Sequence, residues 1–141
     1  DVWHISLFIC FFFFYVEELR NYCTGLPCVS EDFPFDEDVL AFRIWGKIFA
    51  MVNLSDTKWF VLKCNPDLAV ELRDAHPEIE SAWHMNKKHW NQINLFGCLD
   101  DSFIQELIRH SYSLVVKNFP RRKKELSPEV VSVSSTLDVF L

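Results

Sequence analysis

The chain has 141 residues, of which 50% are hydrophobic and 24% are charged, and its formal net charge is −6. This length fits one domain of about 100–200 residues, and the apolar share is sufficient for a packed core. The negative charge excludes a protein that coats nucleic acid with its whole surface, but it is compatible with a local basic patch.

The two ends of the chain differ from its middle in composition. Residues 2–15 are almost wholly apolar and include four consecutive phenylalanines. A membrane-spanning helix needs about 20 apolar residues, and a signal peptide needs a cationic start, whereas no Lys or Arg precedes Arg20. We therefore expect residues 1–15 to be an extension outside the domain, with part of a membrane anchor as the alternative. Residues 125–141 are expected to form a C-terminal tail, which leaves residues 16–124 for the domain.

The domain is predicted to begin with a helix. Apolar residues recur at helical spacing from Val16 to Leu26, and Pro27 ends the helix because its nitrogen cannot donate a hydrogen bond. Five acidic residues follow within the segment Glu31–Asp38, which Pro34 interrupts. Acidic clusters of this kind are usually solvated, so this segment is interpreted as an exposed acidic loop.

Five strands and two further helices account for the rest of the domain. Gly46 joins two apolar runs, which predicts a tight hairpin. The pair Asn65-Pro66 begins the second helix, because Asn can cap a helix and Pro suits its first turn. An aspartate, Asp100 or Asp101, caps the last helix, and Pro120 closes it. The expected strands are residues 39–45, 47–54, 59–64, 79–83 and 88–96.

The predicted order of elements is therefore helix, three strands, helix, two strands, helix. Strands and helices that are segregated along a chain favour an α+β fold over an alternating α/β fold. We expect two layers, with helices covering one face of an antiparallel sheet.

Motifs for catalysis, phosphate binding and metal binding are missing from the sequence. The glycines are isolated, and neither a His-Glu-x-x-His nor a Gly-x-Ser-x-Gly motif occurs. The histidines His84 and His89 would supply too few ligands for a metal, next to two lysines that repel a cation. The five cysteines include no Cys-x-x-Cys pair. We expect a protein without enzymatic activity, cofactor or metal, whose free thiols suit the reducing cytoplasm.

Two basic segments are the candidate sites. Two lysines and a histidine directly precede Trp90, and a second basic run follows the last helix. Cations beside an aromatic ring suit a phosphate backbone with a base or sugar packed on the ring. The structural alternatives are that Trp90 packs in the sheet core, that His84 and Asn86 simply shape the turn through side-chain to backbone hydrogen bonds, and that the second run only favours a helix C-terminus. The candidate nucleic-acid contacts are Lys87, Lys88, His89, Trp90, Arg121, Arg122, Lys123 and Lys124.

Several motifs also occur in a fixed order along the domain. They are Val16–Cys23, Glu31–Phe35 with Asp38–Leu40, Leu62–Pro66, His84–Asn91, and His110–Tyr112 with Leu114–Val116. In sequence and separation they resemble the MmcQ/YjbR family of small bacterial domains, over nearly all of residues 16–124. The resemblance implies a YjbR-like fold with the element order given above, a shape likened to frataxin (CyaY) and to type III secretion chaperones. It also implies DNA binding, the role commonly given to this family.

Two classes of function follow from these observations. The first is DNA binding through the local basic patches. The second is a protein-interaction or ligand-binding module, chaperone-like or frataxin-like, in which the acidic loop Glu31–Asp38 receives a basic partner. For a frataxin-like iron site the first helix offers only Glu17 and Glu18. For either function we expect a monomer with no membrane association.

Overall fold

The computed structural model describes residues 15–56, 58–83 and 85–137. The predicted extension at residues 1–15 lies outside these ranges except for Tyr15, which belongs to a helix whose described part covers residues 15–25. Within the described ranges, none of the helices has the length and apolar character needed to cross a membrane.

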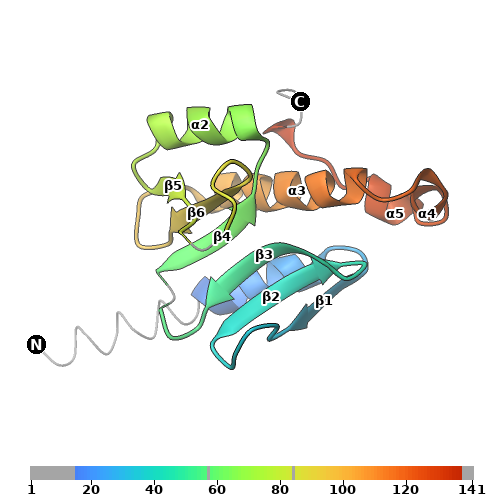
Figure 1. The fold of residues 1–141 in the computed structure, drawn as a ribbon, viewed down its shortest axis with the longest axis horizontal. Coiled ribbons are helices and arrows are strands. Elements are labelled where there is room, and N and C mark those ends of the chain that lie inside the picture. Colours follow the sequence, from blue (N-terminus) through green and yellow to red (C-terminus); the bar gives the residue numbers. More distant parts are fainter. Residues whose placement is uncertain (1–14, 57, 84, 138–141) are drawn as a thin grey trace, which may run out of the picture.

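A six-stranded antiparallel sheet forms one layer of the fold, in the order β1-β2-β3-β4-β6-β5 (Figure 1). The helix over residues 15–25 and the long helix α3 (Asp101–Lys117) cover one face of this sheet. The other face, here called the open face, is turned toward the viewer in Figure 1. The two-layer α+β class predicted from the sequence is confirmed. The strands are β1 (Val29–Asp32), β2 (Val39–Ile44), β3 (Lys47–Asn53), β4 (Trp59–Lys63), β5 (Ile79–Ser81) and β6 (Trp90–Asn94).

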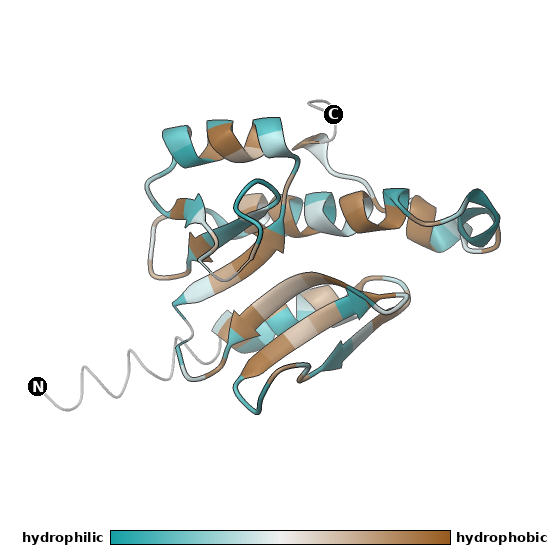
Figure 2. Ribbon diagram, in the orientation of Figure 1, coloured by the Kyte–Doolittle hydropathy of each residue, from teal (hydrophilic) through white to brown (hydrophobic). Residues whose placement is uncertain are grey.

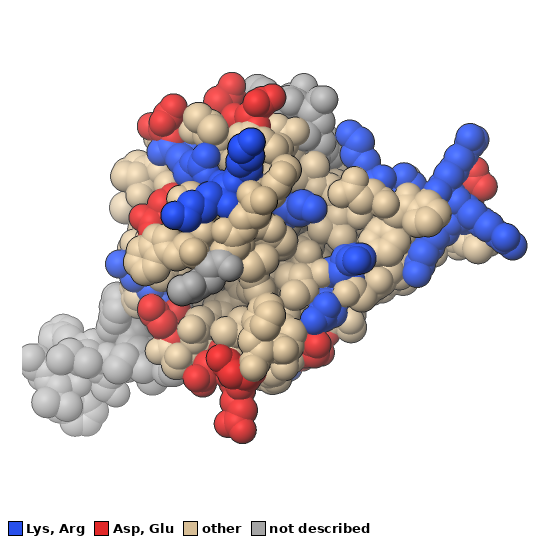
Figure 3. Space-filling view, in the orientation of Figure 1, with Lys and Arg blue, Asp and Glu red and all other residues tan. Residues whose placement is uncertain are grey.

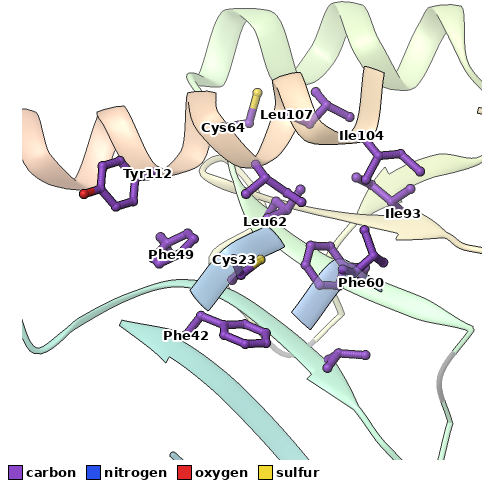
Figure 4. Packing of buried hydrophobic residues seen from close by; sticks show 14 of the residues in the cluster. Cys23, Phe42, Phe49, Phe60, Leu62, Cys64, Ile93, Ile104, Leu107 and Tyr112 are labelled. Atoms are coloured by element: carbon purple, nitrogen blue, oxygen red, sulfur yellow. The ribbon is translucent and has the colours of Figure 1, made fainter. Parts of the chain in front are cut away.

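The core lies between the sheet and the helices. Strand residues alternate between the two faces, so Phe42 and Phe60 point toward the helices and are fully buried. Figure 4 shows these rings with Phe49 of β3 and Tyr112 of α3, and the Phe49 and Tyr112 rings meet edge to face with centroids 5.4 Å apart. Each such buried aromatic side chain contributes about 1.5–3 kcal/mol to stability.

Helix α2 (Pro66–Ala75) begins as predicted, because the Asn65 side chain accepts hydrogen bonds from the backbone nitrogens of Asp67 and Leu68. Its first turn is also tied to α3, since the backbone nitrogen of Asn65 donates to Nε2 of the buried His110 at 3.2 Å. These contacts fix the position of the end of β4 and the start of α2 above α3.

Strand β1 differs from the prediction, which placed Glu31 and Asp32 in the acidic loop. Both residues pair with β2 at the edge of the sheet. Their charges are compensated by ion pairs with Arg20 (2.5 Å) and Arg43 (2.9 Å), respectively. The hydrogen bond from Arg20 is the main cause that lowers the pKa of Glu31. The prediction of a loop is therefore wrong for Glu31 and Asp32, and residues 33–38 form the connection to β2.

Residues 125–137 also differ from the prediction, because they pack on the domain rather than form a separate tail. Two short helices, α4 (Arg121–Glu125) and α5 (Pro128–Val131), follow α3, and Val130 is buried in the core. The Glu106 carboxylate of α3 accepts hydrogen bonds from Ser135 Oγ at 2.6 Å and Thr136 N at 2.8 Å. In Figure 2, α4 is the hydrophilic segment beyond the end of α3. The folded body therefore continues past residue 124.

Candidate nucleic-acid interface

The sheet divides between β3 and β4, and a groove opens at the division. These strands pair only through Ala50–Val52 and Phe60–Leu62, so the start of β3 and the end of β4 separate (Figure 1). Ser111 of α3 lies between them: its Oγ accepts a hydrogen bond from the Lys63 nitrogen (3.0 Å) and donates one to the Phe49 carbonyl (2.5 Å). The buried hydroxyl thus takes the place of a strand-to-strand hydrogen bond at the base of the groove.

Both layers of the fold line this groove, which has a volume of about 810 Å³. We call it the basic groove, because three of the side chains on its walls are cationic. The sheet supplies the cations and Trp90, and the end of α3 supplies polar and apolar groups. Its main lining residues are Arg43, Lys47, Lys63, Trp90, Asn118 and Phe119.

Trp90 lies on the open face at one wall of the groove. It is the direct cross-strand partner of Lys63, so both side chains project from the same face of the sheet. The ring is half-buried and does not belong to the hydrophobic core cluster. The alternative that Trp90 packs in the sheet core is therefore wrong.

The turn before β6 places two exposed lysines next to Trp90. The Asn86 side chain accepts a hydrogen bond from the Lys88 nitrogen (3.0 Å), and the Asn86 carbonyl accepts from the nitrogens of His89 and Trp90. Lys87 and Lys88 are exposed, and His89 is half-buried. The local hydrogen bonds thus hold the predicted cationic segment at the margin of the basic groove, whereas His84 lies outside the described residues.

The hairpin between β2 and β3 connects the groove to α4. Trp45 and Gly46 have φ angles of 51° and 82°, and two positive values are typical of a type I′ turn. The Trp45 ring meets Phe119 edge to face with centroids 5.0 Å apart. Lys123 Nζ of α4 lies 5.0 Å from the Trp45 centroid and 5.5 Å from that of Phe119. These contacts hold the second basic run beside the groove.

The two predicted basic segments lie on one face of the molecule. Figure 3 shows Lys and Arg side chains on the loop between β5 and β6, at the ends of β3 and β4, and on α4, while Asp and Glu gather on the loop between β1 and β2 and on α2. Sequence reasoning missed Lys47 and Lys63, because each is an isolated lysine in an apolar strand. The strand register places Lys63 opposite Trp90, and Lys47 lines the same groove from β3.

The described residues can be examined for metal ligands and for reactive thiols. Within the described residues, no three His, Cys, Asp or Glu side chains lie close enough together to hold a metal ion. Burial raises the pKa of Cys64 to about 12 and raises that of Cys23 as well, so both thiols are unreactive near neutral pH. The two other described cysteines, Cys28 and Cys98, are exposed and free.

Comparison with known proteins identifies the family. The YjbR family model matches residues 24–114. YjbR of Escherichia coli K12 is 33% identical over 112 residues, which cover 79% of this chain and 95% of that protein. YbdF of E. coli O157:H7 is 29% identical over 110 residues, which cover 77% of this chain and 90% of that protein. The crystal structure of DR2400 from Deinococcus radiodurans is similar with a TM-score of 0.76 and 34% identity, over 86% of this chain and 91% of that one. The crystal structure of a protein from Pseudomonas syringae is similar with a TM-score of 0.59 and 28% identity, over 70% of this chain and 96% of that one. The chain belongs to the YjbR family.

Proposed function

We propose that the protein binds DNA through the phosphate backbone at the basic groove. The observation that carries the proposal is that two basic segments far apart in the sequence flank one groove whose wall holds a half-buried tryptophan. Phosphate contacts by Lys and Arg supply most of the affinity of proteins that bind DNA without sequence preference.

Charge segregation supports this proposal. A chain with a net charge of −6 repels a polyanion over most of its surface, so binding must come from a local patch. Arg43 keeps an acidic neighbour, because its Nε donates to Asp32 at 2.9 Å. Lys47 and Lys63 therefore provide the phosphate contacts inside the groove.

The candidate residues take different roles in this proposal. Trp90 stacks on a base or sugar, an interaction that tolerates any sequence because every base has an aromatic face. The basic side chains on both sides of the groove contact successive phosphates. They are Lys87, Lys88 and His89 on the side of the β5–β6 loop, and Arg122, Lys123 and Lys124 on the side of α4. Arg121, like Arg43, keeps an acidic neighbour, because its Nε donates to Glu125 at 2.9 Å.

The test compares two lysines that flank the same strand. Lys63 ends β4 inside the basic groove, and Lys58 precedes β4 and lies over the Trp59 ring, 5.0 Å from its centroid. Lys63→Glu and Lys58→Glu change the net charge equally. Binding of fluorescently labelled DNA is measured by anisotropy at several salt concentrations for the wild type and both variants.

Lys63→Glu is expected to weaken binding and to reduce the salt dependence by about 0.7 in log–log slope with single-stranded DNA, or about 0.9 with a duplex, for a lost phosphate contact. Lys58→Glu should leave the slope unchanged. The double variant Lys87→Glu with Lys88→Glu should weaken DNA binding more than Lys63→Glu does. The proposal is wrong if wild-type protein binds no DNA at low salt, or if Lys58→Glu weakens binding as much as Lys63→Glu.

A further inference from the structure

A second groove lies on the open face, at the other end of β4 from the basic groove. It has a volume of about 470 Å³, and its walls are mainly apolar. We call it the apolar groove. Strands β3 and β4 supply its floor, while the β1–β2 connection and the segment after β5 supply its sides. Its main lining residues are Phe35, Met51, Trp59, Val61, Trp83 and Met85.

Large apolar side chains at the margins of this groove are left in solvent. Phe35 is 67% exposed and Trp83 is 62% exposed, and the Trp83 ring lies 6.1 Å from that of Trp59, centroid to centroid. Both methionines of the chain, Met51 and Met85, line the same groove. Methionine adapts its shape to a partner, so this surface suits an apolar ligand made of irregular side chains.

Negative charge adjoins one end of the apolar groove. Asp36, Glu37 and Asp38 are exposed and lie between two lining residues, Phe35 and Val39. The Asp36 carboxylate accepts hydrogen bonds from the nitrogens of Asp38 and Val39, which fixes the shape of this connection. An occupant with cations at this end would be complementary in charge.

The backbone of the groove floor restricts the conformation of the occupant. Strands β3 and β4 are both central strands, and they pair with each other across the groove through Met51 and Val61. An extended peptide lying on this face finds no free strand edge to which it could add. A helix satisfies its own backbone hydrogen bonds and can insert apolar side chains from one face.

We propose that the apolar groove docks an amphipathic helix of a partner protein, with Lys or Arg at the end that lies over Asp36–Asp38. The helix inserts bulky apolar side chains between Phe35 and Trp83, over Met51 and Val61. This binding site is separate from the basic groove and does not depend on DNA binding.

The experiment uses the full chain and a fluorescein-labelled synthetic peptide of about 18 residues, or five helical turns. Leu and Phe form one face of the peptide, and Lys residues follow at one end. A scrambled peptide and one with Glu in place of Lys are the comparison probes. The protein variants are Trp83→Ser and Phe35→Ser, with Leu126→Ser, an apolar residue that is 77% exposed at the end of α4, as the matched control.

The wild type and Leu126→Ser are expected to bind the amphipathic peptide equally, while Trp83→Ser and Phe35→Ser weaken binding about tenfold or more, as for buried aromatic anchors. Glu37→Lys should weaken binding, whereas Glu71→Lys on α2 should not. Because the substituted side chains are exposed, thermal melts should show that every variant remains folded.

Four results would each overturn the proposal. The first is no binding of the amphipathic peptide to the wild type. The second is equal binding of the scrambled peptide, and the third is equal binding of the amphipathic peptide to Trp83→Ser and to the wild type. The fourth is a wild type that sediments as a dimer which Trp83→Ser dissociates, because the occupant would then be a second copy of the chain.

Discussion

The two grooves on the open face share one strand and differ in chemistry. Trp59 and Val61 of β4 line the apolar groove, and Lys63 of the same strand lines the basic groove. All three side chains project from the same face, because strand residues alternate. The grooves therefore differ in the segments beside them. The acidic connection between β1 and β2 adjoins the apolar groove, whereas the lysine-bearing turn before β6 and α4 adjoin the basic groove. The ligand class of a sheet surface depends on the segments that surround it.

The largest effect is expected from removing the hydroxyl that holds the sheet divided. Ser111→Ala leaves the Lys63 N–H and the Phe49 carbonyl without their buried partner. The loss should lower the free energy of unfolding by about 3 kcal/mol, measured by urea denaturation. Ser113→Ala is the control, since Ser113 Oγ donates one partly buried hydrogen bond to the Val133 carbonyl. Its loss should lower the free energy of unfolding by about 1 kcal/mol. Equal losses would contradict a special role of Ser111 at the groove.

One tryptophan variant of each groove can be tested in both the DNA-binding assay and the peptide-binding assay. Trp90→Ala should reduce DNA affinity by about 1–3 kcal/mol, the contribution of stacking on one base, and leave peptide binding unchanged. Trp83→Ser should have the opposite pattern. If either variant lowers the affinity for DNA and the affinity for the peptide equally, the grooves do not act as separate sites.

Acid should loosen the C-terminal segment that packs on α3. The hydrogen bond from Ser135 Oγ is the main cause that lowers the pKa of Glu106 to about 2. A depressed carboxyl pKa contributes stability that is fully present above the unfolded value of about 4.3 and is lost as pH falls toward 2. Urea denaturation should show stability falling over this pH range in the wild type and less so in Glu106→Gln, which should also be less stable at pH 7. An identical pH dependence in both proteins would contradict this assignment.

The smallest effect is expected at the contact that holds α4 beside the groove. Lys123→Ala removes the cation from the Trp45 and Phe119 rings and should lower stability by about 0.5–1 kcal/mol. Amide hydrogen exchange should increase in α4 but not in the strands. Unchanged exchange in α4 would show that Lys123 does not anchor the helix.

Much of the fold could be predicted from the sequence, because its signals are local. Helical spacing from Val16 to Leu26, the Asn65 cap and the glycine between β2 and β3 each specify their element directly. Strand β1 could not be recognised, since Val29 is its only apolar residue and its acidic residues are compensated by distant arginines. The C-terminal helices were missed because Glu106 and Val130 show their roles only in the tertiary structure.

The candidate site could be predicted only in part. The segment Lys87–Trp90 is recognisable because cations and an aromatic ring are adjacent in the sequence. The basic groove depends on the separation of β3 from β4 and on the pairing of Lys63 with Trp90, which are properties of the sheet. The apolar groove likewise combines Phe35, Met51 and Trp83 from three distant segments, whose shared surface no sequence window contains.

The most direct test of DNA binding at the basic groove follows the indole N–H signals of the tryptophans by NMR during titration with a short single-stranded DNA, whose bases are free to stack on an aromatic ring. The chain has five tryptophans. Among the described residues, Trp90 lies in the basic groove, and Trp59 and Trp83 lie in the apolar groove. The Trp90 signal is expected to shift with increasing DNA, the shift should disappear at high salt, and the Trp59 and Trp83 signals should stay unchanged. No shift of Trp90, or shifts confined to Trp59 and Trp83, would contradict it.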